Sequence, residues 1–570
     1  MIARVARGAL ALAAAVVVAT QPLAATAVEV AARPAIDETP GFEVDSGVIT
    51  KVQKSLAGFG LYDDPIDGRW NRDLERAVRQ FQGWVGLPVD GRIGAELIEK
   101  IKNRTQINGL LRRLDDTRHS DRESARKALL SNVETRDLVG DGQIRADPTR
   151  DSAPCFREPS ARCLLAEAAE SAKAIHRDEL RDWAFGEILV AQARAGLAED
   201  AIVTVRFIRD PRLIMVALRD IARGQAVAGN ADEALEAVAI VPDLEKQVEA
   251  LADIATIQAK RNVDPRDTID RLLIVLVNID DPLKQVAYRA LAAVIAARAG
   301  DTETARKLID AAERRARRTG EGGGLRYVAG ALAEMEKPVK ALEVLEDVPD
   351  QSDRVPILVK AAAAQARSGD AERALQTADG IAEERYRAIV LGRIATAQSA
   401  AGDCDAALGT VNQALAATDA IRFPYAKAYA VSRLASAAAD ICSPSDSVDG
   451  VPRPADVAGR IEDDRLRAEV QWEIAARRRR AGDNAGAAEI EALAEESTKA
   501  IRSDLSRVWL FGEIAEGLAD VGEFMEAQTA FERGLTIAAA IDNPWGRARA
   551  VARMATTLVV LTDTADSASR

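Results

Sequence analysis

A turn flanked by small residues recurs through most of this chain, and this repeat limits what the chain can fold into more than any other feature. We call the central residue of each turn its anchor. Seven residues before the anchor, nine of the ten copies have Ala, and five residues after it, eight of the ten have Ala. A period of this kind predicts a solenoid of paired helices. The ten anchors lie 33 to 40 residues apart, at Gly196, Gly229, Asn262, Gly300, Glu336, Gly369, Gly402, Cys442, Gly482 and Gly522.

The small residues also explain how such helices would pack. One Ala on each helix lets the two helices approach to the low end of the ~8–10 Å range of packed helices. A Gly or Asn between them can adopt the left-handed conformation that ends the first helix. The chain is 48% apolar but only 4% aromatic, a mixture that suits close-packed helices better than sheets. We therefore predict an all-α protein.

The repeat resembles the tetratricopeptide repeat, in which a small residue, Gly-Asp and Ala-Leu follow one another at these spacings. The segment IATAQSAAGDCDAAL, Ile394 to Leu408, is the best single copy. The family's usual aromatic residues inside each hairpin are mostly replaced here by Ala, Gln or Leu. The resemblance covers about ten hairpins, roughly residues 163–562, and implies a long α-solenoid whose surface binds other proteins.

A second doubled pattern stands near the front, in the segment DPIDGRWNRDLERAVRQFQGWVGLPVDGRIG from Asp64 to Gly94. An apolar residue, Asp, Gly and Arg occur at Ile66–Arg69 and again at Val89–Arg92. Asp-Gly pairs favour turns, because the Asp side chain bonds onward backbone and Gly accepts positive φ. Apolar residues at helical spacing predict three short helices around one small core, which Trp70 and Trp84 help to stabilise. These residues are Val52, Leu56 and Phe59; Leu74, Ala77, Val78 and Phe81; and Leu97, Ile98 and Ile101.

This front block resembles the peptidoglycan-binding domain of many cell-wall hydrolases along its whole length, Val52 to Ile101. The resemblance implies a three-helix module that binds murein without cutting it. The family usually has Gly and then Thr after each Asp-Gly turn. Here Asn71, which tolerates the left-handed conformation, and Leu74 replace them in the first copy, and Leu97 replaces Thr in the second. The matching elements are Val52-Gln53, Gly60-Leu61-Tyr62, Asp67-Gly68, Ala77-Val78, Phe81-Gln82, Gly86-Leu87-Pro88 and Val89-Asp90-Gly91.

The residues of the two turns are the candidate binding site for peptidoglycan. An Arg can pair with the carboxylates of peptide stems, and an exposed indole can stack on a sugar face. The alternative is that the Asp-Gly pairs only build turns and that Trp70 fills the core. The candidates are Asp67, Gly68, Arg69, Trp70, Asp90, Gly91 and Arg92.

The N-terminus has the three parts of a secretory signal peptide. Arg4 and Arg7 precede an apolar run from Ala9 to Ala19, and the small-residue pattern Ala25-Thr26-Ala27 follows. A membrane anchor is the alternative, but the run is well short of the ~20 residues that span a bilayer. We expect a soluble protein exported to the periplasm and cut near Ala27.

The four cysteines fit an oxidising compartment, where two disulfides would form. Cys155 and Cys163 flank a Pro-rich turn, and Cys404 and Cys442 would lie close together at adjacent turn tips of the solenoid. The alternative is that these cysteines are buried or free thiols.

Charge and residue types exclude several functions. The net charge is -13 without a basic block, which disfavours nucleic acid as a partner. Only His119 and His176 could supply imidazole ligands, so we expect no metal site and no cofactor. No Cys–His pair in a plausible domain and no Gly-x-Ser-x-Gly elbow occurs. A lone catalytic Glu remains an open alternative.

The sequence thus predicts a non-catalytic envelope protein that binds peptidoglycan and presents a helical scaffold to unknown envelope proteins. The alternatives are a murein hydrolase that resembles a lytic transglycosylase, or a regulator of such an enzyme. The predicted regions are a signal peptide (1–27), a flexible tether (28–47), the peptidoglycan-binding-like module (48–103), a charged helical segment with a linker (104–162), the solenoid (163–562) and a tail (563–570).

Overall fold

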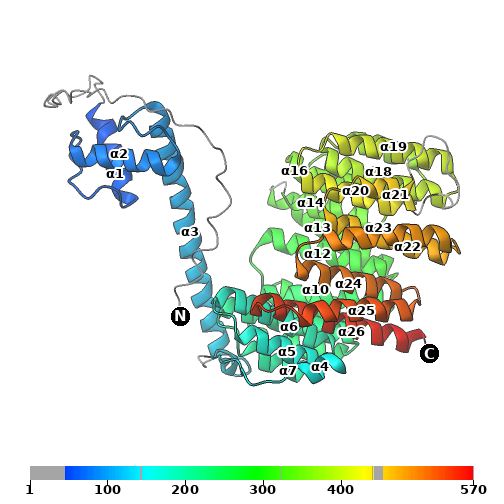
Figure 1. Cartoon of the computed structure of the whole chain (residues 1–570). Helices are drawn as coiled ribbons and strands as arrows, with labels where there is room; N and C mark the ends of the chain where they lie inside the picture. The colour runs from blue at the N-terminus through cyan, green and yellow to red at the C-terminus, as the bar shows by residue number, and fades with distance from the viewer. Residues whose placement is uncertain (1–44, 141–143, 321–322, 440, 442–452, 569–570) are drawn as a thin grey trace, which may run out of the picture. The chain divides into compact units, whose positions relative to one another are not determined.

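A computed structural model describes residues 45–140, 144–320, 323–439, 441 and 453–568 (Figure 1). Within these residues the chain forms 26 α-helices, one short 3-10 helix and no strand, so the all-α prediction is confirmed. The chain divides into two compact units, Met1–Asp115 and Asp116–Arg570, and each is described by itself. None of the described helices is both long enough and apolar enough to cross a membrane.

The first unit is built on α1 (Ser46–Gly58), α2 (Arg72–Val85) and the start of α3 (Ala95–Ser131). Ile98 is 40% exposed, contrary to the predicted core, because Leu97 and Ile101 lie one turn apart and take up the inward face. The third helix is also not short, since α3 continues beyond residue 103. The buried core consists of Ile49, Val52, Leu56, Tyr62, Leu74, Ala77, Val78, Phe81, Ile93, Leu97 and Ile101.

The second unit contains ten helical hairpins, each with a first and a second helix. Short elements precede them, namely a 3-10 helix (Arg136–Leu138), α4 (Ala153–Arg157) and α5 (Ala161–Lys173), and α26 (Pro544–Ala568) follows them. The hairpins are α6 (Asp178–Arg194) with α7 (Ala198–Val205), α8 (Pro211–Ala228) with α9 (Ala231–Ala239), α10 (Leu244–Lys260) with α11 (Arg266–Leu276), α12 (Pro282–Arg298) with α13 (Thr302–Thr319), α14 (Gly323–Glu334) with α15 (Pro338–Leu345), α16 (Gln351–Arg367) with α17 (Ala371–Asp379), α18 (Glu384–Ala400) with α19 (Cys404–Asp419), α20 (Pro424–Ala439) with α21 (Pro454–Gly459), α22 (Asp464–Arg480) with α23 (Asn484–Ala500), and α24 (Asp504–Ala519) with α25 (Phe524–Ala539).

The predicted anchors lie at the hairpin turns. Nine of the ten fall within the described residues, and all nine have positive φ, between 56° and 94°. Asn262 and Glu336 are the only positive-φ residues other than Gly in the described part of the chain. The left-handed conformation costs an ordinary residue about 1–2 kcal/mol, whereas Asn tolerates it, so the repeat geometry imposes it at Glu336. The tenth anchor, Cys442, lies outside the described residues.

The recurrent alanines fill the interface inside each hairpin. All nine alanines that precede an anchor by seven residues are 0% exposed, and the eight that follow an anchor by five residues are at most 1% exposed. Larger side chains at these positions would push the paired helices apart. The register read from the sequence is therefore the register of the packed helices.

The array closes on itself. The first helices of successive hairpins stack on one another from α6 to α24, and α26 stacks on α24. α26 then packs against both α6 and α5 (Figure 1). One core cluster contains buried residues from both ends of the unit, such as Leu164 and Met554. The first helices, from α6 to α26, thus form a closed ring of the second unit.

The ring is completed by a hairpin whose two helices come from opposite ends of the repeat region. Ala555 on α26 stands 40 residues after Ala515, and Ala168 on α5 stands 33 residues before Ala201. Both Ala555 and Ala168 are 0% exposed. They therefore continue the two series of buried alanines, with α26 in the place of a first helix and α5 in the place of a second helix.

Two of the four cysteines are placed as a pair. Cys155 on α4 and Cys163 on α5 form a disulfide, with their Cα atoms 5.7 Å apart. Cys404 begins α19 and is not a free thiol. Cys442 lies outside the described residues, so a bridge between Cys404 and Cys442 stays a prediction.

Candidate functional site

Each Asp-Gly turn of the first unit is built around a buried glutamine from the preceding helix. In the first copy this residue is Gln53 on α1, which is 0% exposed. Its Nε2 donates to Asp67 Oδ1 at 3.0 Å and to the Arg69 carbonyl oxygen at 3.1 Å. Its Oε1 accepts from the Gly68 N–H at 2.8 Å. One amide side chain therefore fixes three consecutive residues of the turn.

The second copy repeats this arrangement with Gln82 on α2. Its Nε2 donates to Asp90 Oδ1 at 2.7 Å and to the Arg92 carbonyl oxygen at 3.3 Å, and its Oε1 accepts from the Gly91 N–H at 2.9 Å. We call each turn with its glutamine a clamped turn. No hydrogen bond links the two clamped turns within the described residues, so the structure makes them two separate, equivalent units.

The two turn glycines are structural residues. Gly68 and Gly91 have φ values of 72° and 73°, and both are buried. A Cβ atom on Gly68 would lie 2.6 Å from Ser46 Oγ, and one on Gly91 would lie 2.7 Å from Arg79 Nε. Only glycine fits such positions without a shift of the neighbouring side chain.

The two turn carboxylates are held in the ionised form. Hydrogen bonds from the Gln53 amide and the Arg69 N–H lower the pKa of Asp67. Those from the Arg92 N–H and the Gln82 amide lower the pKa of Asp90. A general acid needs a pKa near the working pH, so this pair does not suit the proton donation that glycoside hydrolysis requires.

The side chains that face solvent are those on either side of each Asp-Gly pair. Ile66 and Val89, which precede the Asp residues, are 46% and 54% exposed. Arg69 and Arg92, which follow the Gly residues, are exposed as well. Each clamped turn thus presents an apolar side chain beside a guanidinium group, which can pair with a carboxylate in a bidentate manner.

Trp70 and the positions of the absent threonines belong to the core. Trp70 packs against the core cluster in the place that Ile93 takes in the second copy. Leu74 and Leu97 are 0% and 2% exposed, so these leucines add apolar burial and leave the outer surface of the turns unchanged. Asn71 does not use the left-handed conformation that it tolerates: it is extended and caps α2 by accepting the Leu74 N–H at 2.7 Å.

Trp84 packs at the edge of the core that it was predicted to stabilise, and it is 51% exposed. Phe59 and Phe81 stack on each other and leave no inner space for the indole, whose edges meet them at centroid distances of 6.2 and 6.0 Å. The Arg104 guanidinium carbon lies 4.6 Å from the centre of the Trp84 ring. A ring held in this way, with half its surface open, can support a sugar face.

Three residues of the site were therefore missed as functional residues, namely Gln53, Gln82 and Trp84. The two glutamines carried a signal, because each follows an apolar residue on the helix before its turn, as Val52-Gln53 and Phe81-Gln82. Nothing in the sequence separates an exposed Trp84 from a buried one.

Residues 46–101 match the family model described as "Putative peptidoglycan binding domain". A helical repeat region follows this domain. No curated protein matches the chain in sequence. One solved structure similar to the chain is a "Circular tandem repeat protein with novel repeat topology and enhanced subunit contact surfaces". It shares 13% sequence identity at a TM-score of 0.14, over 92% of this chain and 98% of that chain.

Proposed function

We propose that this protein is exported, binds peptidoglycan through its front module without cutting it, and presents the helical ring to protein partners of the cell envelope. The observation that carries the proposal is the match of residues 46–101 to a peptidoglycan-binding family, together with the two clamped turns that this segment forms. Export is supported by the signal-like N-terminus and by the disulfide between Cys155 and Cys163.

The exposed surface of the module suits the proposed ligand. Arg69 and Arg92 offer two guanidinium groups to the carboxylates of the peptide stems. Ile66, Val89 and Trp84 offer apolar surface to the carbon faces of sugars and stem residues. The Asp and Gly residues of the turns keep these side chains in place and do not need to touch the ligand.

A non-catalytic role fits the carboxyl groups of the second unit. Burial raises the pKa of Asp182, Asp253 and Glu469, as in many catalytic acids. These three residues lie on α6, α10 and α22, however, and each has a partner of its own. Asp182 accepts two backbone N–H groups, while Asp253 and Glu469 lie 3.9 and 3.7 Å from an Arg nitrogen. They do not form a paired acid and base.

Sedimentation of the purified full-length protein with isolated sacculi tests the proposal. The wild-type chain should pellet with the sacculi. The double variant Arg69→Ala/Arg92→Ala should pellet at least about tenfold less at the same concentration, because it loses two charge-assisted contacts. Lys100→Ala/Lys102→Ala is the matched control, since it removes two exposed charges from α3 of the same module.

Two outcomes would count against the proposal. If the wild type and the turn variant pellet equally, the turns do not contribute to binding. If the wild type does not pellet, peptidoglycan is not the ligand. A zymogram on embedded murein should show no clearing zone, and a clearing zone from the purified protein would establish the hydrolase alternative.

A further inference from the structure

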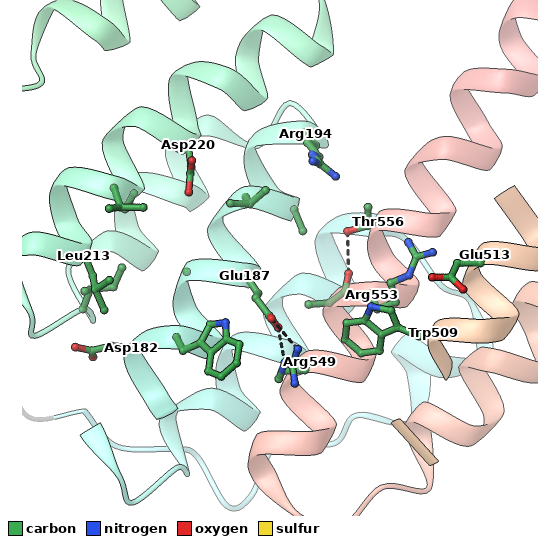
Figure 2. A pocket seen from close by; sticks show the side chains of 18 residues that line it. Asp182, Glu187, Arg194, Leu213, Asp220, Trp509, Glu513, Arg549, Arg553 and Thr556 are labelled. Carbon is green, nitrogen blue, oxygen red and sulfur yellow. Dashed lines mark hydrogen bonds and ion pairs between the residues drawn. The ribbon is translucent and has the colours of Figure 1, made fainter. Parts of the chain in front are cut away.

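A pocket lies where the ring of the second unit closes. It has a volume of about 530 Å³ and is lined by side chains from α6, α8, α24 and α26 (Figure 2). We call it the seam pocket, because α6 and α8 begin the repeat region and α24 and α26 end it. Its volume falls within the ~300–1,000 Å³ of small-molecule sites. Any ligand held there would touch both ends of the repeat region.

The carboxylates in the wall of the seam pocket are already engaged. Glu187 accepts two hydrogen bonds from Arg549, at 2.7 and 2.9 Å. Asp220 is paired with Arg219 at 2.7 Å. The remaining two are also occupied, since Asp182 accepts backbone N–H groups and Glu513 accepts from Arg465 at 2.8 Å. Each of these four carboxylates thus already has a partner within the protein, which for Asp182 is the backbone alone.

Arg194 is the one cation of the pocket lining for which the described residues supply no ion-pair partner. Arg549 and Arg553 also line the pocket, but Glu187 and Glu516 neutralise them. Among the described residues, no carboxylate lies within ion-pair distance of Arg194, and it is half-buried. Burial lowers the pKa of Arg194, and so does the nearby Arg223, against the opposing effect of the Glu516 and Asp220 carboxylates. In Figure 2, no dashed line joins Arg194 to another residue of the pocket lining. A half-buried charge without a partner is costly, and an anion would relieve that cost.

Two tryptophans supply flat apolar surface to the same pocket. The Arg549 guanidinium carbon lies 5.0 Å from the Trp183 ring and 5.1 Å from the Trp509 ring, which fixes both indoles. Trp183 is nevertheless 52% exposed. Such indoles stack on the apolar faces of sugar rings.

We propose that the seam pocket binds a saccharide that carries one carboxylate, with its sugar ring on Trp183 and Trp509 and its carboxylate on Arg194. One spare cation matches one negative charge. A phosphate monoester carries between one and two charges at neutral pH and would leave an anion unpaired beside Glu187 and Glu513. The site is separate from the front module, and this inference does not rest on the proposed function. Acidic sugars of peptidoglycan and uronic acids share this chemistry.

Calorimetric titration of the full-length protein tests the assignment. The probes are N-acetylglucosaminyl-N-acetylmuramic acid and glucuronosyl-glucose, which carry one carboxylate each, and diacetylchitobiose, a neutral disaccharide. At least one acidic disaccharide should bind about tenfold or more tightly than diacetylchitobiose. The one that binds more tightly identifies the source of the ligand. Because the ligand bridges the two ends of the ring, saturation should also raise the melting temperature.

Variants separate this pocket from the front module. Arg194→Gln should reduce binding of the acidic disaccharide to the level of diacetylchitobiose. Arg393→Gln removes an exposed charge from the first helix α18, far from the pocket lining, and should change nothing. If Arg194→Gln fails to fold, Trp183→Ala replaces it, because its half-exposed ring tolerates truncation, and it should weaken both kinds of disaccharide about fivefold.

The proposal fails if neutral and acidic disaccharides bind equally, or if Arg194→Gln binds as the wild type does. It also fails if a tripeptide with an aromatic residue and a free carboxylate binds more tightly than either acidic sugar, since the pocket would then be a peptide site. Sacculus sedimentation reports on the turns of the front module, so its failure would leave the titration result intact.

Discussion

The front module and the ring both connect helices by tight turns, but different residues stabilise those turns in the two regions. In the module, a buried glutamine bonds an Asp, a Gly and an Arg, so each turn depends on one side chain. In the ring, each described turn has a left-handed residue at its anchor, and the recurrent alanines that pack the helices beside it are at most 1% exposed. The structure of each turn in the module therefore depends on one residue, whereas the packing of the ring depends on many equivalent residues.

The difference matters for function. A turn that is fixed by one buried amide can carry exposed residues such as Arg69 and Arg92 in a constant geometry, which a binding site requires. A ring whose contacts recur at every hairpin can vary its exposed residues from repeat to repeat and keep its fold. The seam is the exception within the ring, because there the contact between α5 and α26 joins the two ends of the repeat region.

Gln53→Leu should give the largest effect, since it breaks one clamped turn. The substitution removes the Gln53 hydrogen bonds to Asp67, Gly68 and Arg69 and leaves the buried Gly68 N–H without a partner. We expect a loss of about 2–4 kcal/mol in the local stability of the module. Amide hydrogen exchange of the full-length protein, followed on peptides from residues 46–101, measures this loss.

Gln80→Leu is the matched control for that experiment, because Gln80 lies on the exposed face of α2. Its exchange should equal that of the wild type. Exchange in the ring should stay unchanged in both variants. If Gln53→Leu leaves the module as protected as Gln80→Leu does, the glutamine is not the residue that holds the turn.

Ala395→Leu tests the distributed packing of the ring. Ala395 is 0% exposed on α18, and the larger side chain would force α18 and α19 apart. We expect a cost of about 1–3 kcal/mol, with faster exchange in these two helices and little change elsewhere. Ala400→Leu on the same helix is the control, because Ala400 is exposed. Equal exchange in both variants would show that the hairpins are not held by close alanine contact.

Arg549→Gln tests the seam. The Arg549 and Glu187 side chains are 16% and 29% exposed, so their ion pair should contribute more than one at the surface. We expect a loss of about 1–2 kcal/mol and faster exchange in α6 and α26, the two helices that the pair joins. Arg367→Gln breaks the pair with Glu336, whose side chains are 55% and 53% exposed, and should cost less than about 1 kcal/mol. Similar losses in both variants would mean that the ion pair at the seam contributes no more stability than an ion pair at the surface.

Much of the ring could be predicted from the sequence, because its information is periodic. Even the anchors Asn262 and Glu336 were placed by register alone, and the structure gives both of them positive φ. Closure could not be derived in the same way. It depends on the curvature that accumulates over all the hairpins, which a repeat period does not fix. Ala168 and Ala555 are in register with the two alanine series, and this pattern is the sequence feature that indicates the additional hairpin of α26 and α5.

The candidate site was predictable at the level of the turns but not of single side chains. The doubled Asp-Gly-Arg pattern located both turns. A motif that combines Asp, Gly, Arg and Trp does not show which members face solvent, because the direction of each side chain depends on packing. In the structure, the Asp and Gly residues form the turns, Trp70 packs against the core, and Arg69 and Arg92 are exposed at the surface.

Acid titration should give the smallest effect and bears on the clamped turns alone. The pKa values of Asp67 and Asp90 are lowered in the folded state from the usual value of 3.8. A lowered folded pKa means that the contribution of each carboxylate is present above pH 3.8 and is lost as the pH falls through the folded pKa. Protonation removes an acceptor from Gln53 and Gln82, so both turns should loosen.

Hydrogen exchange in residues 64–94, corrected for the intrinsic rate, should therefore rise below pH 3.8 more steeply in the wild type than in Asp90→Asn. Asp63→Asn, at an exposed residue outside the clamped turns, should follow the wild type. If all three proteins respond alike, the turn carboxylates do not contribute to the clamp.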